Sequence, residues 1–177
     1  MALAANVLKW QIGQMVSKRL SREAGHRRKF LVIIDDTPEC GRAVAYASRR
    51  AKNTGGALVL MFVIDTSDFQ HFLGVGEIMR SEAEERARLA LEKLATQVRE
   101  KQGLEPELIV RAGETTEELQ SLVEEDQDIA ILVLAAASGK EGPGPLIQML
   151  AGKSASFPIP VTVIPANLSD EDIDAVA

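Results

Sequence analysis

Short apolar runs alternate with amphipathic stretches along most of this chain. Continuous apolar segments occur at 30–34, 57–64, 129–135 and 161–164, with a shorter one at 108–110. Such runs are typical of strands buried on both faces of a sheet, and the stretches between them repeat apolar residues at helical spacing. We therefore predict five strands separated by helices.

Capping residues mark the expected helix boundaries. Thr37 and Pro38 are a favourable N-cap and first helical residue, and they predict a helix that ends at Gly55. Thr115 and Glu118 have the spacing of a capping box and predict the start of a later helix. Strands that alternate with helices in this way indicate an α/β fold, in which helices cover both faces of an open parallel sheet.

The segment between the second strand and the longest expected helix has no regular pattern. Residues 66–76 contain two phenylalanines, a histidine and two glycines, and the helix is expected over 77–102. The segment would either fold over a ligand as a lid or pack its aromatic rings against the domain.

The N-terminal residues differ from the rest of the chain in charge and in pattern. Residues 1–29 carry seven basic residues and one acidic residue, a net charge of +6. A helix is expected over 2–24, as an amphipathic arm that contacts an anionic membrane or a partner protein. The alternative is a solvated or subunit-packing extension. The apolar residues at a spacing of four are Leu8, Ile12, Val16 and Leu20.

These patterns predict that the chain has three parts. They are the basic arm at 1–29, one α/β domain at 30–165 and an acidic tail at 166–177, where a short surface helix is expected. Because the total charge is −6 and the arm carries +6, the remaining residues carry −12. A body this acidic repels the phosphate backbone, so we expect no nucleic-acid binding.

Composition also bears on location and on metal binding. No apolar run approaches the roughly 18 residues that span a bilayer. Lys9 interrupts the first apolar segment, unlike a secretory signal, so a cytoplasmic protein is expected. Cys40 is the only cysteine and there are only two histidines, so we expect no metal site. Asp35 and Asp36 have no His, Cys or Ser partner evident nearby, and we expect no catalytic site.

The glycine-rich segment after the fourth strand is the strongest candidate binding site. Gly139, Gly142 and Gly144 precede a helix-compatible stretch, and glycines let the backbone turn sharply and approach a ligand. Free amides at the helix start would hold a phosphate, whereas in the alternative the glycines only form turns. An ordinary P-loop is excluded, because Ile147 stands where a motif ending in Gly152-Lys153-Ser154 requires its first glycine.

Three segments together resemble the universal stress protein family, namely 30–37, 60–65 and 131–164 with its late strand. The loop sequence Gly-Lys-Glu-Gly-Pro-Gly-Pro-Leu looks like a bacterial subgroup of that family. The resemblance covers 30–165. It implies a five-stranded, Rossmann-like parallel sheet of order 3-2-1-4-5, a homodimer joined along strand five, and a role in stress tolerance.

Members of the family that bind ATP carry the motif Gly-x2-Gly-x9-Gly-Ser or Gly-Thr after strand four. Aligned on that strand, the first glycine of the motif becomes Ala135 or Ala136, the second is Gly139 and the third is Gly152. Twelve residues rather than nine separate the last two, and Lys153 follows where the motif has Ser or Thr.

The resemblance also assigns two residues outside this loop. Asp35 matches the aspartate on the nucleotide side, and Val63 matches the residue whose backbone meets adenine. The loop itself would add amides, positive charge and a hydroxyl group that could hold an anion, and the resemblance implies ATP or ADP as the ligand. The predicted nucleotide-binding residues are Asp35, Val63, Ala135, Ala136, Gly139, Lys140, Gly142, Gly152, Lys153 and Ser154.

These features support a leading hypothesis and two alternatives. The leading hypothesis is a homodimeric cytoplasmic stress-response regulator with an adenine-nucleotide site and no turnover. In the first alternative, a nucleotide-free dimer binds its partners through the basic arm. In the second, the chain is an enzyme that acts on a nucleotide or phosphorylated metabolite through the same cleft.

Overall fold

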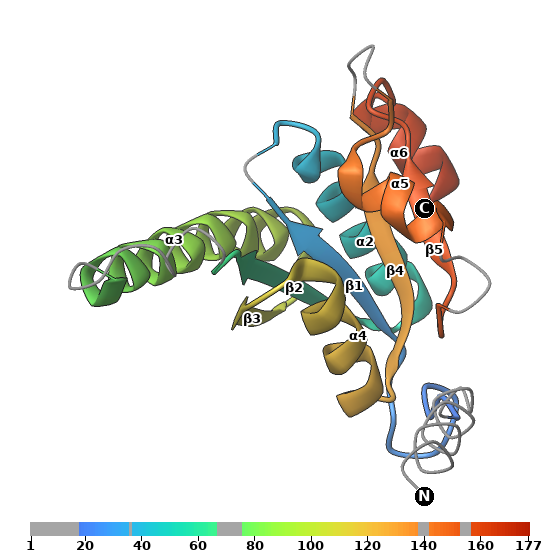
Figure 1. The fold of residues 1–177 in the computed structure, drawn as a ribbon. Helices are drawn as coiled ribbons and strands as arrows, with labels where there is room; N and C mark the ends of the chain where they lie inside the picture. Colours follow the sequence, from blue (N-terminus) through green and yellow to red (C-terminus); the bar gives the residue numbers. More distant parts are fainter. Residues whose placement is uncertain (1–17, 36, 67–75, 138–141, 153–156) are drawn as a thin grey trace, which may run out of the picture.

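A computed structural model describes residues 18–35, 37–66, 76–137, 142–152 and 157–177. Five parallel strands form one sheet in the order β3-β2-β1-β4-β5, with helices on both faces (Figure 1). The predicted fold class and strand order are therefore confirmed. The strands are β1 Lys29–Ile34, β2 Ala57–Ile64, β3 Glu107–Ala112, β4 Ile129–Ala135 and β5 Val161–Ile164. The helices are α2 Cys40–Thr54, α3 Gly76–Gln102, α4 Thr115–Glu125, α5 Pro145–Gly152 and α6 Asp170–Val176.

Alternate side chains of each central strand enter two separate cores. On β1, Phe30, Val32 and Ile34 pack with α2 and α3, whereas Leu31 and Ile33 pack with α4 and α5. A strand directs successive side chains to opposite faces, so a continuous apolar run is what a two-sided sheet requires. All five of these side chains are at most 9% exposed.

The first helix begins later than its capping residues predict. We expected Thr37 as N-cap and Pro38 as first helical residue, but α2 begins at Cys40 with Glu39 as N-cap. The Thr37 hydroxyl instead donates a 2.5 Å hydrogen bond to Asp35. The Thr37 side chain thus closes a local turn with Asp35, and α2 begins three residues later. The other end agrees with the prediction, since Gly55 adopts a left-handed conformation as C-cap.

The predicted capping box of α4 is also wrong. The N-cap is Glu114, whose carboxylate accepts a 2.8 Å hydrogen bond from the Glu117 amide. Thr115 is the first helical residue, and its neighbour Thr116 is buried. The Glu114 carboxylate thus accepts from a free amide of the first helical turn, which is the role that the sequence assigned to the Thr115 hydroxyl.

The described end of the N-terminal arm is not helical. Residues 18–24 of the helix expected over 2–24 form turns and extended chain, while residues 2–17 lie outside the described part. Arg19 donates hydrogen bonds to three backbone carbonyls of the domain, the shortest 2.5 Å long to Val123. The Leu20 amide donates to the Gln127 carbonyl at 3.0 Å. These contacts hold this part of the chain beside the start of β4.

The acidic tail forms the short helix that the sequence predicts. A capping box between Ser169 and Asp172 starts α6, and Ile173 is fully buried. Helix α6 packs against α2, where Arg42 Nη1 lies 2.7 Å from Asp170 Oδ1. Among the described helices, none is long and apolar enough to cross a membrane.

A methyl group at Gly56 has no room beside β1. Its Cβ would lie 2.6 Å from the Arg28 carbonyl oxygen, which also accepts a hydrogen bond from the Ala57 amide and is therefore fixed. We expect Gly56→Ala to lower the free energy of unfolding by about 1–3 kcal/mol, as over-packing does. Gly41→Ala is the matched control, because Gly41 lies in α2 with open space around it. Equal denaturant midpoints for the two variants would contradict this geometry.

Candidate functional site

β1 and β4 are neighbouring strands, and the order in which strands are added to the sheet reverses between them. From β1 the chain proceeds to β2 on one side, while β4 and β5 lie on the other. Ligands of open parallel sheets bind at this place. A cavity of about 110 Å³ lies there, between the ends of the two strands and the start of α5. Its lining includes Asp35, Thr37, Glu39, Cys40, Ala135, Ala137, Gly144 and Ile147.

Asp35 follows the last residue of β1 and is held by a local turn. Its Oδ1 accepts hydrogen bonds from the Thr37 amide at 3.0 Å and the Thr37 hydroxyl at 2.5 Å. Its second carboxylate oxygen, Oδ2, accepts no hydrogen bond from the described residues. Since a carboxylate has about four acceptor positions, Asp35 keeps acceptor capacity for a ligand hydroxyl or amine.

Two glycines shape the approach to α5. Gly142 and Gly144 have φ angles of +100° and +102°, which side chains other than glycine rarely adopt. The Gly144 carbonyl accepts the first helical hydrogen bond, from the Gln148 amide at 3.1 Å. The amides of Leu146 and Ile147 precede that bond and have no partner within the helix. They are positioned to attract an anion, because the helix dipole adds partial positive charge there.

Cys40 lines the cavity beside Asp35, although the sequence indicated no cysteine partner for that aspartate. Its Sγ lies 3.8 Å from the Ile33 carbonyl oxygen, and the side chain is buried. Burial raises the pKa of the Cys40 thiol to about 11. The thiol is therefore protonated near neutral pH and is a poor nucleophile.

Cys40 should accordingly resist thiol reagents. A pKa two units above the ordinary value leaves about a hundredfold less thiolate at pH 8. We expect the folded protein to react with a disulfide reagent at least about a hundredfold more slowly than the same protein in denaturant. Reaction at the denatured rate would show that the thiol is neither buried nor neutral.

The structure brings together only part of the predicted nucleotide site. Asp35 and Ala135 line the cavity, and Ala136 lies next to it, with its amide bonded to the Ile164 carbonyl at 2.8 Å. Gly142 lies in the approach to α5, and Val63 lies near the end of β2. The predicted residues Gly139, Lys140, Lys153 and Ser154 lie outside the described part of the chain.

Gly152 is the predicted residue that lies furthest along α5 from the cavity. It is the last residue of that helix, whereas the cavity adjoins the first turn. Eight residues at about 1.5 Å each separate the two ends by roughly 10 Å. The third glycine of the predicted motif therefore lies at the end of α5 that is remote from the cavity.

The lining residues that the predicted site did not include are Ile33, Thr37, Glu39, Cys40, Leu134, Ala137, Pro143, Gly144, Pro145, Leu146 and Ile147, and Thr37 and Cys40 are the two beside Asp35. Thr37 was assigned to helix capping, and Cys40 was considered only as a metal ligand. The signal for Thr37 was its position two residues after an aspartate, which is the spacing of a local aspartate turn. Cys40 offered no such signal, because its place in the cavity depends on where α2 begins.

A sequence model of the universal stress protein family matches residues 26–165. The chain belongs to this family. Universal stress protein A from Lactobacillus plantarum has a similar structure, with 17% identity, 77% coverage of this chain, 97% coverage of that protein and a TM-score of 0.66. No curated protein matches this chain significantly in sequence.

Two other structures of the family have bound nucleotides. The universal stress protein from Archaeoglobus fulgidus in complex with dAMP is 18% identical to this chain, with a TM-score of 0.52. The matched region covers 77% of this chain and 97% of the Archaeoglobus protein. A family protein from Arabidopsis thaliana with AMP bound is 17% identical to this chain, with a TM-score of 0.55. The matched region covers 81% of this chain and 94% of that protein. At these identities the similarity establishes the fold.

Proposed function

We propose that this universal stress protein acts as a stress-response regulator by binding an adenine nucleotide between the ends of β1 and β4. The observation that carries the proposal is the Asp35 carboxylate, which lines the cavity with an acceptor oxygen that no described residue uses. The first amides of α5 face the same space and suit the phosphate end. Family proteins bound to AMP and dAMP support this choice of ligand.

The backbone of Val63 supports its predicted contact with adenine. The Ile64 carbonyl points toward the β3 side, where it accepts a 3.0 Å hydrogen bond from the Gly113 amide. Carbonyls alternate in direction along a strand, so the Val63 carbonyl points toward the β1 side. Pairing with β1 ends one residue earlier, at Phe62. Among the described residues outside the strands, none donates a hydrogen bond to this carbonyl, which leaves it available to an exocyclic amine.

The charge of the cavity favours a monophosphate over ATP or ADP. Asp35 and Glu39 line the cavity, and no lysine or arginine is among its described lining residues. Each added phosphate would bring more negative charge near two carboxylates. A cavity of about 110 Å³ also encloses only part of a nucleotide, so the remainder would lie along the open edge toward Val63.

The family resemblance further suggests a cytoplasmic homodimer joined along β5. Val161 and Val163 of this edge strand are 36% and 42% exposed, although both are large apolar residues. An edge strand with exposed valines is suited to pair with a second copy of the chain. Pairing would supply hydrogen-bond partners for its free backbone groups and would bury its apolar side chains. We propose this edge as the dimer contact.

The alternative function is partner binding through the basic arm. Several basic residues of the arm are engaged in contacts within the chain. Arg19 donates to carbonyls of the domain, Arg27 donates to the Gly56 carbonyl at 2.7 Å, and Lys29 pairs with two carboxylates. These cations are engaged with the domain itself. The alternative therefore rests on the other basic residues of the arm, which are Lys18, Arg22 and Arg28 in the described part and Lys9 outside it.

Native mass spectrometry of the purified protein tests the proposal. We expect a dimer whose mass increases by one adenine nucleotide per chain, either as purified or after addition of AMP. Addition of GMP serves as the control for the base, since the Val63 carbonyl would not meet an amine at the same ring position. A dimer that binds neither nucleotide would favour the nucleotide-free alternative.

A further inference from the structure

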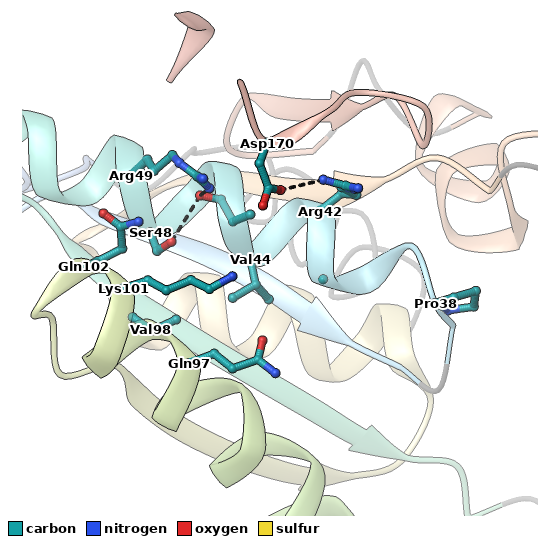
Figure 2. Close-up of a pocket in the computed structure, with 12 residues that line it drawn as sticks. Pro38, Arg42, Val44, Ser48, Arg49, Gln97, Val98, Lys101, Gln102 and Asp170 are labelled. Carbon is teal, nitrogen blue, oxygen red and sulfur yellow. Dashed lines mark hydrogen bonds and ion pairs between the residues drawn. The ribbon is translucent and has the colours of Figure 1, made fainter. Parts of the chain in front are cut away.

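A second pocket is lined by residues of α2 that do not line the nucleotide cavity. It has a volume of about 220 Å³ and lies among α2, α3 and α6 (Figure 2). The two pockets have no lining residue in common. The polar and charged residues that line the second pocket are Arg42, Ser48, Arg49, Gln97, Lys101, Gln102 and Asp170.

The lining of this pocket is positively charged although the protein is acidic. Arg42, Arg49 and Lys101 contribute three positive charges, and Asp170 and the adjacent Asp174, which pairs with Arg49, contribute two negative charges, which leaves an excess of one positive charge. The whole chain carries −6. Arg42 and Arg49 each pair with an aspartate of α6, whereas Lys101 has no carboxylate partner among the described residues, so the pocket can accept a further anion.

The tail helix already supplies part of that negative charge. Arg42 Nη1 lies 2.7 Å from Asp170 Oδ1, and Arg49 Nε pairs with the Asp174 carboxylate. Both aspartate side chains are more than 60% exposed, whereas the Arg49 side chain is only 13% exposed. The aspartates are therefore easily replaced as partners, and the arginines are the fixed part of the pocket.

Helix α3 provides donors that have no partner among the described residues. Figure 2 shows Lys101 and Gln97 extending from α3 toward the α2 side of the pocket. No carboxylate of the described residues lies within ion-pair distance of Lys101, and Gln97 makes no side-chain hydrogen bond with them. Donors thus face the pocket from two sides, with guanidinium groups on α2 and an ammonium and an amide on α3.

We propose that this pocket binds a small phosphate-bearing anion and that the aspartates of α6 compete with it. Tetrahedral phosphate oxygens accept hydrogen bonds from several directions, which suits donors on two facing helices better than a planar carboxylate does. The volume is below the roughly 300–1,000 Å³ of sites for drug-sized ligands, so the anion is small. Occupancy would release Asp170 from Arg42 and so couple the pocket to the tail.

An NMR titration of the full chain with pyrophosphate at low ionic strength tests this proposal. We expect saturable shifts of the Ser48, Gln97 and Lys101 amides. Lys101→Gln should weaken binding about fivefold to tenfold, and Asp170→Asn should strengthen it about threefold, because the competing charge is gone. Lys93→Gln is the matched control, since it removes the same charge from an exposed position of α3 outside the pocket.

Three results would overturn the proposal. They are the absence of saturable shifts at these amides, an equal loss of affinity in Lys93→Gln and Lys101→Gln, or equal binding of pyrophosphate and succinate. Shifts confined to Asp35, Ala136 and Gly142 would locate pyrophosphate in the nucleotide cavity and would likewise reject the second site. This readout separates failure of the second site from failure of the proposed nucleotide site.

Discussion

Replacing Asp35 with alanine is expected to weaken AMP binding about 10- to 100-fold. This is the effect of losing a charged hydrogen-bond acceptor, which contributes about 1.5–3 kcal/mol. The substitution also removes a negative charge from the cavity, and that change alone would strengthen the binding of a phosphate. A loss of affinity would therefore identify a specific hydrogen bond from the ligand to Asp35. Calorimetric titration with AMP measures the difference.

Asp128→Ala is the matched control for charge. Asp128 immediately precedes β4, at the amino end of the strands, whereas the cavity lies at their carboxyl ends. Its Oδ1 lies 2.7 Å from His26 Nδ1. Its removal changes the net charge of the protein by the same amount. We expect its AMP affinity to equal that of the unsubstituted protein. Equal affinities for the Asp35 and Asp128 variants would contradict a direct contact between Asp35 and the nucleotide.

The largest loss of stability is expected from Leu31→Ala. Leu31 lies in β1, at the centre of the sheet, and has no exposed surface. Truncation of a buried leucine removes favourable burial and leaves a cavity, at a cost of about 2–5 kcal/mol. Chemical denaturation should therefore show a much lower midpoint at an unchanged slope.

Leu89→Ala makes the same chemical change at an exposed position. Leu89 lies on α3 with 63% of its surface exposed, so the expected change in the free energy of unfolding is within about 0.5 kcal/mol. A Leu89 variant as unstable as the Leu31 variant would mean that this face of α3 packs against something, such as a second copy of the chain.

The strands could be predicted because their apolar pattern has few alternatives. A five-residue apolar run such as 30–34 exceeds what a one-sided strand or a surface helix contains, and its short length and β-branched residues favour a strand covered on both faces over a buried helix. Observed β2, β4 and β5 have the limits that their apolar runs predict. The family resemblance then supplied the strand order, which no local pattern contains.

The helix starts could not be predicted as well, because several residues compete to cap them. Thr37 hydrogen-bonds to Asp35 instead of capping α2, and Glu114 takes the place assigned to Thr115 in α4. The energies of such alternatives differ by only about 1 kcal/mol, so tertiary packing decides among them. The start of α2 in turn decided whether Cys40 would line the cavity.

The two pockets differ in how far the sequence could reveal them. Asp35 and Ala135 are predictable because strand ends in a parallel sheet share one edge. The basic pocket is not predictable, since Arg42 and Asp170 are 128 positions apart and meet only when α6 packs on α2. In the sequence, the tail shows only that it is acidic and helix-compatible.

Calorimetric titration of the unsubstituted protein with AMP, ADP and ATP tests the central claim most directly. We predict saturable binding of one AMP per chain, with affinity that falls as phosphates are added, because two carboxylates line the cavity. Absence of heat with all three nucleotides at millimolar concentration would contradict an adenine-nucleotide site at the ends of β1 and β4.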